Sequence, residues 1–185
     1  MELQSFPTVE LAGGDVRLRE MEADDLDALM AIVSDETTIA HTTIERIPSR
    51  ADEAEFLAGV VAHRAEEPRL RYELGVVAAG EFIGLARLYV DRPEQRCGDL
   101  GYMIRRDHWG QGVATAATRL LVRFGFDEIG LHRIWACHDP DNSASGRVLE
   151  KAGLTHEGRI RDHLFVRGRW RDSVTYSILE HERSP

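Results

Sequence analysis

The stretch Leu100–Ala117, LGYMIRRDHWGQGVATAA, passes from a strand-like segment through a glycine-containing turn into an amphipathic helix. The first N–H groups of a helix have no partner within the helix, and they lie at the positive end of its dipole. Such a turn is therefore a ready site for an anion, most often a phosphate group. The sequence predicts that a phosphate-bearing cofactor binds at this turn.

The charge of the chain is unevenly distributed around the turn. The whole chain has a formal net charge of −9, whereas residues 101–126 contain four arginines and one acid, a net charge of +3. This basic segment coincides with the predicted anion site. Residues 1–60 contain 14 acids and four arginines. That acidic segment would suit a cationic substrate, or it is simply a solvated surface.

Composition and length exclude several classes of protein. The 185 residues, 43% of them hydrophobic, predict a single soluble domain over residues 1–185. An acidic chain without clustered Lys and Arg is not expected to bind nucleic acid. No apolar run approaches the roughly 18 residues of a membrane helix, and the N-terminal residues do not resemble a signal peptide. Two cysteines, Cys97 and Cys137, form no disulfide framework or zinc motif. We expect a cytoplasmic protein without metal and without a membrane partner.

The rest of the chain alternates between short strands and amphipathic helices. Apolar residues follow the helical period most closely after Gly112. The predicted strands are Asp15–Glu20, Arg71–Ala79, Glu81–Val90, Asp99–Arg105, His132–His138 and two within Leu154–Glu180, and the predicted helices are Ala23–Ser34, Ser49–Arg64, Gly112–Phe126 and Asn142–Ala152. This order predicts an α/β fold with a mixed sheet, because β–α alternations are too few for a doubly wound fold.

The turn matches neither of the two common nucleotide-binding loops. The NTPase loop requires a lysine, and Lys151 is the only lysine of the chain. The dinucleotide pattern GxGxxG fails because Thr115 stands where the third glycine belongs. Taken alone, the turn could still be a tight connection whose glycines serve only geometry.

Three motifs together resemble the GCN5-related N-acetyltransferase (GNAT) superfamily. They are Ile104-x4-Trp109-Gly110-Gln111-Gly112-Val113-Ala114, then Asn142-Ser143-Ala144-Ser145 with Leu149–Leu154, and then Glu157-Gly158…Arg161…Gly168…Asp172. Ile104, Gly112 and Ala114 match the family's acyl-CoA motif. Trp109 departs from it, since the wider family has Arg or Gln there, and this departure is typical of the RimJ/RimL branch. Characterised members of that branch act on ribosomal-protein N-termini.

The resemblance covers about residues 14–181 and implies a fold and a co-substrate. The fold is α/β, with a mixed, mostly antiparallel sheet of six or seven strands, about four helices and splayed central strands. The co-substrate is acetyl-CoA, whose pantetheine arm would pair with the backbone at Met103 and Ile104. A backbone N–H there would face the thioester oxygen. The residues implied to bind acetyl-CoA are Met103, Ile104, Trp109, Gly110, Gln111, Gly112, Val113, Ala114 and Asn142.

The resemblance also suggests two catalytic residues. Many family members have a tyrosine general acid seven residues after the asparagine, and Leu149 stands there in this chain. Ser145 is therefore the candidate hydrogen-bond donor to the departing sulfur, unless it is only a buried helix hydroxyl. Asp99 is the candidate base, unless it is only an exposed strand-end carboxylate. Glu73 and Glu81 are weaker candidates for the base.

These features predict an acetyl-CoA-dependent N-acetyltransferase that acts on a primary amine. The resemblance implies a protein or peptide N-terminal α-amine as the acceptor. The absence of an obvious strong base agrees with this, because an α-amine with a pKa of about 8 demands only a modest base. The alternatives are a small-molecule amine, such as a polyamine or an antibiotic, and a non-catalytic acyl-CoA-binding module. We expect a monomer or a homodimer.

Overall fold

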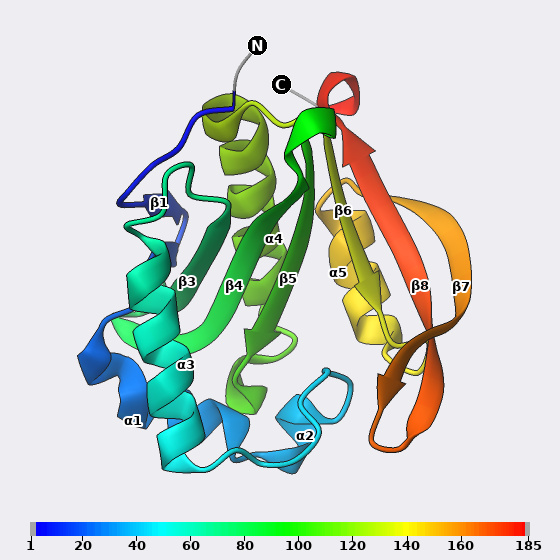
Figure 1. Cartoon of the computed structure of the whole chain (residues 1–185). Coiled ribbons are helices and arrows are strands. Elements are labelled where there is room, and N and C mark those ends of the chain that lie inside the picture. The colour runs from blue at the N-terminus through cyan, green and yellow to red at the C-terminus, as the bar shows by residue number, and fades with distance from the viewer. Residues whose placement is uncertain (1–2, 184–185) are drawn as a thin grey trace.

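The computed structural model describes residues 3–183 as a mostly antiparallel sheet with helices on both faces (Figure 1). The sheet order is β1-β2-β3-β4-β5-β6-β8-β7. The strands are β1 (Glu10–Gly13), β2 (Val16–Glu20), β3 (Arg71–Ala78), β4 (Glu81–Arg92), β5 (Cys97–Ile104), β6 (Arg133–His138), β7 (Thr155–Val166) and β8 (Arg169–Leu179). The helices are α1 (Leu26–Val33), α2 (Glu36–Ile39), α3 (Arg50–His63), α4 (Val113–Phe124) and α5 (Ser143–Lys151). This architecture confirms the predicted GNAT-like fold.

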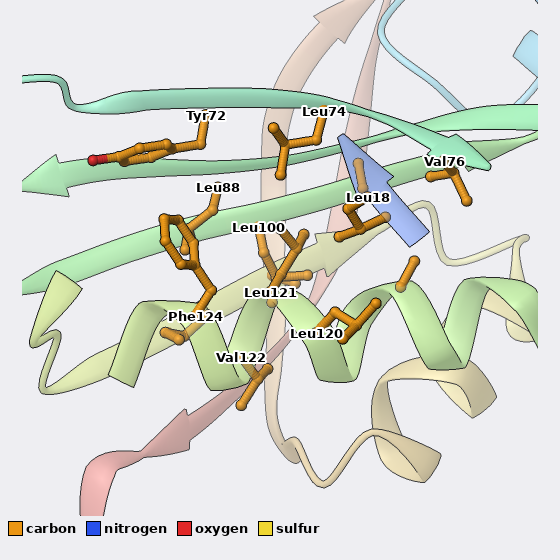
Figure 2. Close-up of a cluster of buried hydrophobic side chains, with 14 of the residues drawn as sticks. Leu18, Tyr72, Leu74, Val76, Leu88, Leu100, Leu120, Leu121, Val122 and Phe124 are labelled. Carbon is orange, nitrogen blue, oxygen red and sulfur yellow. The ribbon is translucent and has the colours of Figure 1, made fainter. Parts of the chain in front are cut away.

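The main core lies between the sheet and α4. Leu18, Leu74 and Leu88 of the sheet are fully buried and face Leu121 and Phe124 of that helix (Figure 2). Burying such side chains supplies most of the stability of a domain, at roughly 25 cal/mol per Å² of apolar surface. The helix predicted from the 3.6-residue period is therefore the one that organises the core. Helices α1 and α3 cover β3 and β4 on the opposite face (Figure 1).

Side-chain caps begin two of the predicted helices. Ser49 accepts a hydrogen bond from the Asp52 N–H, and the Asp52 carboxylate accepts one from the Ser49 N–H, which forms a capping box before α3. Asn142 caps α5 by accepting from the Ser145 N–H at 3.2 Å. Gly153, with φ of +98°, ends α5 as predicted.

Two short elements go beyond the prediction. Strand β1 pairs with β2 and gives the sheet eight strands instead of six or seven. Helix α2 forms in a segment to which the prediction assigned no element, where Asp35 caps it by accepting from the Thr38 N–H. Each element has four residues, too few for a periodic pattern to be recognisable in the sequence.

Strands β5 and β6 form the only parallel pair in the described sheet, and they separate after three residues. Their register comprises only Cys97 with Arg133, Gly98 with Ile134 and Asp99 with Trp135. Strand β5 continues to Ile104 along β4 alone, while β6 continues along β8 (Figure 1). The predicted splay of the central strands is confirmed.

Candidate active site

The splay leaves part of the β5 backbone without a strand partner. Arg105 N–H donates to the Ile83 carbonyl, and the register from Gly84–Ile104 to Tyr89–Asp99 is continuous. Hydrogen-bonded and non-bonded pairs alternate in an antiparallel ladder, so every second residue directs its N–H and C=O away from the partner strand. By this alternation Tyr102 and Ile104 direct their backbone groups away from β4, towards the splay. Met103 directs its own towards Leu85 of β4.

The turn after β5 leaves the first turn of α4 open. Gly110 and Gly112 have φ of +74° and +83°, a left-handed conformation that favours glycine. No atom lies within 4 Å of a Cβ built at either glycine. Gly112 is the N-cap residue of α4, and among residues 3–183 no side chain accepts from that helix's first N–H groups. The predicted anion site is thus a turn with free donors and open space above its glycines.

Side chains of the turn hold it against the end of β5. The Trp109 indole Nε1–H donates to the Ile104 carbonyl at 2.7 Å, although 47% of the residue is exposed. The Gln111 Nε2 donates to the Asp107 carbonyl at 2.9 Å. The bond from Trp109 occupies the Ile104 carbonyl and leaves the Ile104 N–H as a free group in the splay.

The arginines beside the turn differ in their partners. Arg105 forms ion pairs with Glu81 and Asp107, so its charge is already neutralised. Arg106 is exposed, and its side chain bonds only the Thr37 hydroxyl among the described residues, at 3.4 Å. Arg106 is therefore the residue of this pair whose charge is available to an anion.

Ser145 lies one helical turn beyond Asn142, close to β5. Its Oγ is 2.8 Å from the Tyr102 Oη, and its backbone carbonyl is 3.2 Å from the same oxygen. Leu149 is 1% exposed and belongs to the hydrophobic core, so it offers no polar atom to the site. The tyrosine hydroxyl that approaches Ser145 thus comes from β5, and sequence reasoning missed it.

Asp99 sits at the end of the β5–β6 pairing, where the strands separate. Arg87 donates to its Oδ2 at 2.5 Å, and the guanidinium lies over Gly101, where a Cβ would be 2.9 Å from its Nε. The Asp99 side chain is 18% exposed. Burial raises the pKa of this carboxyl above its usual value, and Arg87 only partly offsets this effect. Asp99 is therefore partly buried and ion-paired, unlike the exposed strand-end carboxylate considered as its alternative.

The weaker candidates for the base lie elsewhere. Glu73 is 5% exposed and accepts from Tyr89 at 2.5 Å, with the His63 ring nitrogen at 3.4 Å. Glu81 begins β4 and pairs with Arg105 beside the turn. Neither carboxylate is next to the β5–β6 separation, so the structure brings only Asp99 close to that point.

The β7–β8 hairpin closes over the loop that follows α2. Arg167 donates to the carbonyls of Ile39, Ala40 and Ile44, and Arg171 to those of His41 and Thr42. The loop is tied to the end of β6 as well, because the His41 ring lies 3.1 Å from Asp139. The loop after α2, the β7–β8 hairpin and the end of β6 thus border the open side of the splay (Figure 1).

Within residues 3–183, no cluster of His, Cys, Asp or Glu could hold a metal ion. None of the helices in that range is long and apolar enough to cross a membrane. Both cysteines are free thiols, Cys97 buried and Cys137 partly buried.

Comparison with protein families gives a match over most of the chain. The model of the acetyltransferase (GNAT) domain matches residues 15–155. The described strands β2 to β6 and helices α1 to α5 lie within that range.

Individual relatives agree with this match. "Putative ribosomal N-acetyltransferase YdaF" of Bacillus subtilis is 36% identical over 60% of this chain and 60% of its own. Spermidine N(1)-acetyltransferase of Escherichia coli K12 is 26% identical over 56% of this chain and 55% of its own. The solved structure of Mycobacterium smegmatis RimJ in complex with CoA-disulfide has a TM-score of 0.81 and 26% identity, and covers 95% of this chain and 88% of that one.

Proposed function

This chain belongs to the GNAT acetyltransferase family, and we propose that its acceptor is the α-amine of a protein or peptide N-terminus. The protein is an N-acetyltransferase that uses acetyl-CoA, as its homologues are. Acetyl-CoA supplies an activated acyl group on a thiol leaving group. The remaining question is what the residues of this chain do to donor and acceptor.

The turn and the splay together suit the shape of the donor. The free N–H groups of Val113 and Ala114 would bind the pyrophosphate, and the open space above Gly110 and Gly112 lets it approach. Arg106 would add a positive charge at this end. Trp109 and Gln111 fix the turn, and Asn142 fixes the first turn of α5.

The backbone of β5 supplies the pairing and the oxyanion donor. We assign these roles to Tyr102 and Ile104, because the groups of Met103 are directed towards β4. A backbone N–H aimed at the thioester oxygen stabilises the negative charge that develops as the amine attacks. One such donor is typically worth about 10²–10³ in rate.

The proposal about the substrate rests on the carboxylates near the β5–β6 separation, which already have cationic partners. Asp99 pairs with Arg87, Asp91 with Arg92, and Asp139 with Arg171. A polyamine needs several carboxylates that are free to neutralise its charges. A peptide N-terminus brings one amine, which is partly neutral near pH 8. The arrangement therefore favours a single weakly basic amine.

A polyamine is the second candidate acceptor. The identity with a spermidine N(1)-acetyltransferase favours it, whereas the relative named as a ribosomal N-acetyltransferase favours the N-terminus. Sequence similarity alone does not separate these two acceptors, and the paired carboxylates support the N-terminus.

An amine panel tests the proposed acceptor. Thiol release from acetyl-CoA is measured with a free peptide, the same peptide blocked at its N-terminus but retaining an internal lysine, and spermidine. We expect kcat/KM for the free peptide to exceed that for spermidine by about tenfold or more, with the blocked peptide inactive. Equal or greater activity on spermidine, or activity on the blocked peptide, would contradict the proposal.

We further propose that Asp99 accepts the proton of the attacking amine. Asp99→Asn is expected to lower kcat/KM by about 10²-fold near pH 7, and less at pH 9, where the amine is already neutral. Wild-type activity should fall as pH drops through the raised pKa of Asp99, because only the ionised carboxylate accepts a proton. An equal loss at both pH values would assign Asp99 a structural role instead.

A further inference from the structure

A tyrosine hydroxyl from β5 meets the serine of α5 beside the splay. The Tyr102 Oη lies 2.8 Å from the Ser145 Oγ and 3.2 Å from the Ser145 carbonyl, and it has no other partner among the described residues. The two residues are 43 positions apart in the chain. All the hydrogen bonding of this phenol is therefore directed at one residue, the one assigned to the leaving sulfur.

We propose that Tyr102 positions and polarises the Ser145 hydroxyl, so that Ser145 donates its hydrogen bond to the departing thiolate. The inference rests on the proposed role of Ser145 in acetyl transfer. In this arrangement Tyr102 is a positioning residue, because it acts on the sulfur only through Ser145. Nothing in the motifs of the chain identifies it.

The relative acidity of the two hydroxyls decides the direction of the bond. A phenol is a stronger donor than an aliphatic alcohol, and the proposal therefore gives the single Tyr102 proton to the Ser145 Oγ, its nearer acceptor at 2.8 Å, instead of the Ser145 carbonyl at 3.2 Å. That leaves the proton of Ser145 free to point elsewhere. Burial raises the pKa of Tyr102 to about 12, so the phenol keeps its proton and remains a donor at any pH used for assay. Hydrogen bonds in such a chain strengthen one another.

The backbone of Ser145 is fixed as well. Its N–H donates to the Asn142 Oδ1 at 3.2 Å, at the capped first turn of α5. With the amide engaged by Asn142 and the hydroxyl oxygen accepting from Tyr102, the hydroxyl proton of Ser145 is left for a ligand. A donor held in this way loses little entropy when it meets a developing charge.

The chemistry requires a hydrogen bond at sulfur but no proton transfer from Ser145. The amine nitrogen forms the C–N bond, the C–S bond breaks, and its electron pair goes to sulfur. The amine proton passes to Asp99 or to water. The thiolate needs only a donor while charge develops, because a thiol pKa of about 8.5 makes it a tolerable leaving group, and it takes a proton from solvent after release.

A double-mutant cycle tests this inference. Tyr102→Phe, Ser145→Ala and the double variant are compared in kcat and in KM for acetyl-CoA, with the best amine found in the panel. Using that amine, whatever its class, separates this test from the identity of the acceptor. Tyr176→Phe is the matched control, because it also removes a hydroxyl that bonds α5, but at Glu150 instead of Ser145.

We expect Tyr102→Phe to lower kcat about tenfold with KM for acetyl-CoA changed less than twofold. In the Ser145→Ala background the same change should alter kcat less than twofold, and Tyr176→Phe should leave kcat unchanged. Independent, multiplicative losses from Tyr102 and Ser145 would overturn the inference. So would a kcat of Tyr102→Phe within twofold of wild type, or a matching loss in Tyr176→Phe, which would indicate loosening of α5.

Discussion

Helices α3 and α4 lie on opposite faces of the sheet, and their first turns are built differently (Figure 1). Helix α3 begins with Ser49 and Asp52, which satisfy each other's backbone N–H groups. Helix α4 begins with Gly112 in a left-handed conformation, and no side chain in the described part of the chain accepts from its first N–H groups. An N-cap side chain is typically worth about 1 kcal/mol. Helix α4 forgoes that contribution, which leaves its first donors open for the proposed pyrophosphate site.

A bulky, charged substitution at Gly112 is the strongest test of the difference between the N-termini of α3 and α4. Gly112→Glu places a bulky anion where the phosphates are expected, at a φ of +83° that resists any side chain. We expect acetyl-CoA affinity to fall more than about 100-fold in calorimetry, through both bulk and like charge. Gly14→Glu is the control, because that glycine also has positive φ and an open Cβ but lies in the β1–β2 turn. Unchanged affinity in Gly112→Glu would refute the anion site.

A milder variant separates charge from conformation. Asparagine tolerates left-handed backbone better than other non-glycine residues. Gly112→Asn should therefore fold normally and still crowd the site, and we expect affinity for acetyl-CoA to fall about tenfold. A loss as large as that of Gly112→Glu would mean that backbone conformation, and not charge, controls binding.

The indole bond of the turn predicts a smaller effect. Trp109→Phe keeps an aromatic ring and removes the bond from Nε1 to the Ile104 carbonyl, worth about 1 kcal/mol. We expect affinity for acetyl-CoA to fall about threefold to fivefold, since the turn is held less firmly. Trp170→Phe, at an exposed indole of the β7–β8 hairpin, is the control. Equal effects from both variants would exclude a specific role for Trp109.

Removing the cap of α3 should have no effect on acetyl-CoA binding. Ser49→Ala should lower stability by about 1 kcal/mol, or about 2–4 °C in Tm, and leave acetyl-CoA affinity unchanged. The Ser49 backbone and side chain hold the pKa of Asp52 below its usual value. The stabilisation by Asp52 is therefore present above pH 4 and lost as pH falls through the lowered pKa. Asp52→Asn should lower Tm at pH 7, and the difference from wild type should shrink as pH falls through the lowered pKa of Asp52.

The sequence alone predicts the elements that have a periodic hydrophobic pattern or a signature within a few residues. The apolar period of α4, the cap at Asn142 and the glycines of the turn are all readable within a few residues. Strand β1 was missed because its four residues, ELAG, gain their partner only when β2 folds beside them. The open N-terminus of α4 could be inferred, since a glycine stands where a cap would be.

The contacts made by the site residues could not be predicted in the same way. The partner of Ser145 is Tyr102, 43 residues earlier, and the two meet only because β5 and α5 pack beside the splay. The alternation that directs Ile104, and not Met103, into the splay depends on the register with β4. Arg87 reaches Asp99 only because Gly101 leaves room for its guanidinium. Each of these contacts follows from strand pairing, which a single sequence does not display.

The brief pairing of β5 with β6 has a mechanical consequence. Only three residue pairs join the two halves of the sheet, β1 to β5 on one side and β6 to β8 on the other. A ligand arm lying along Tyr102 and Ile104 would act as a missing strand and would brace one half against the other. Amide hydrogen exchange at Tyr102 and Ile104 should then slow on binding. The acetyl donor would in this way be a structural member of the sheet for as long as it is bound.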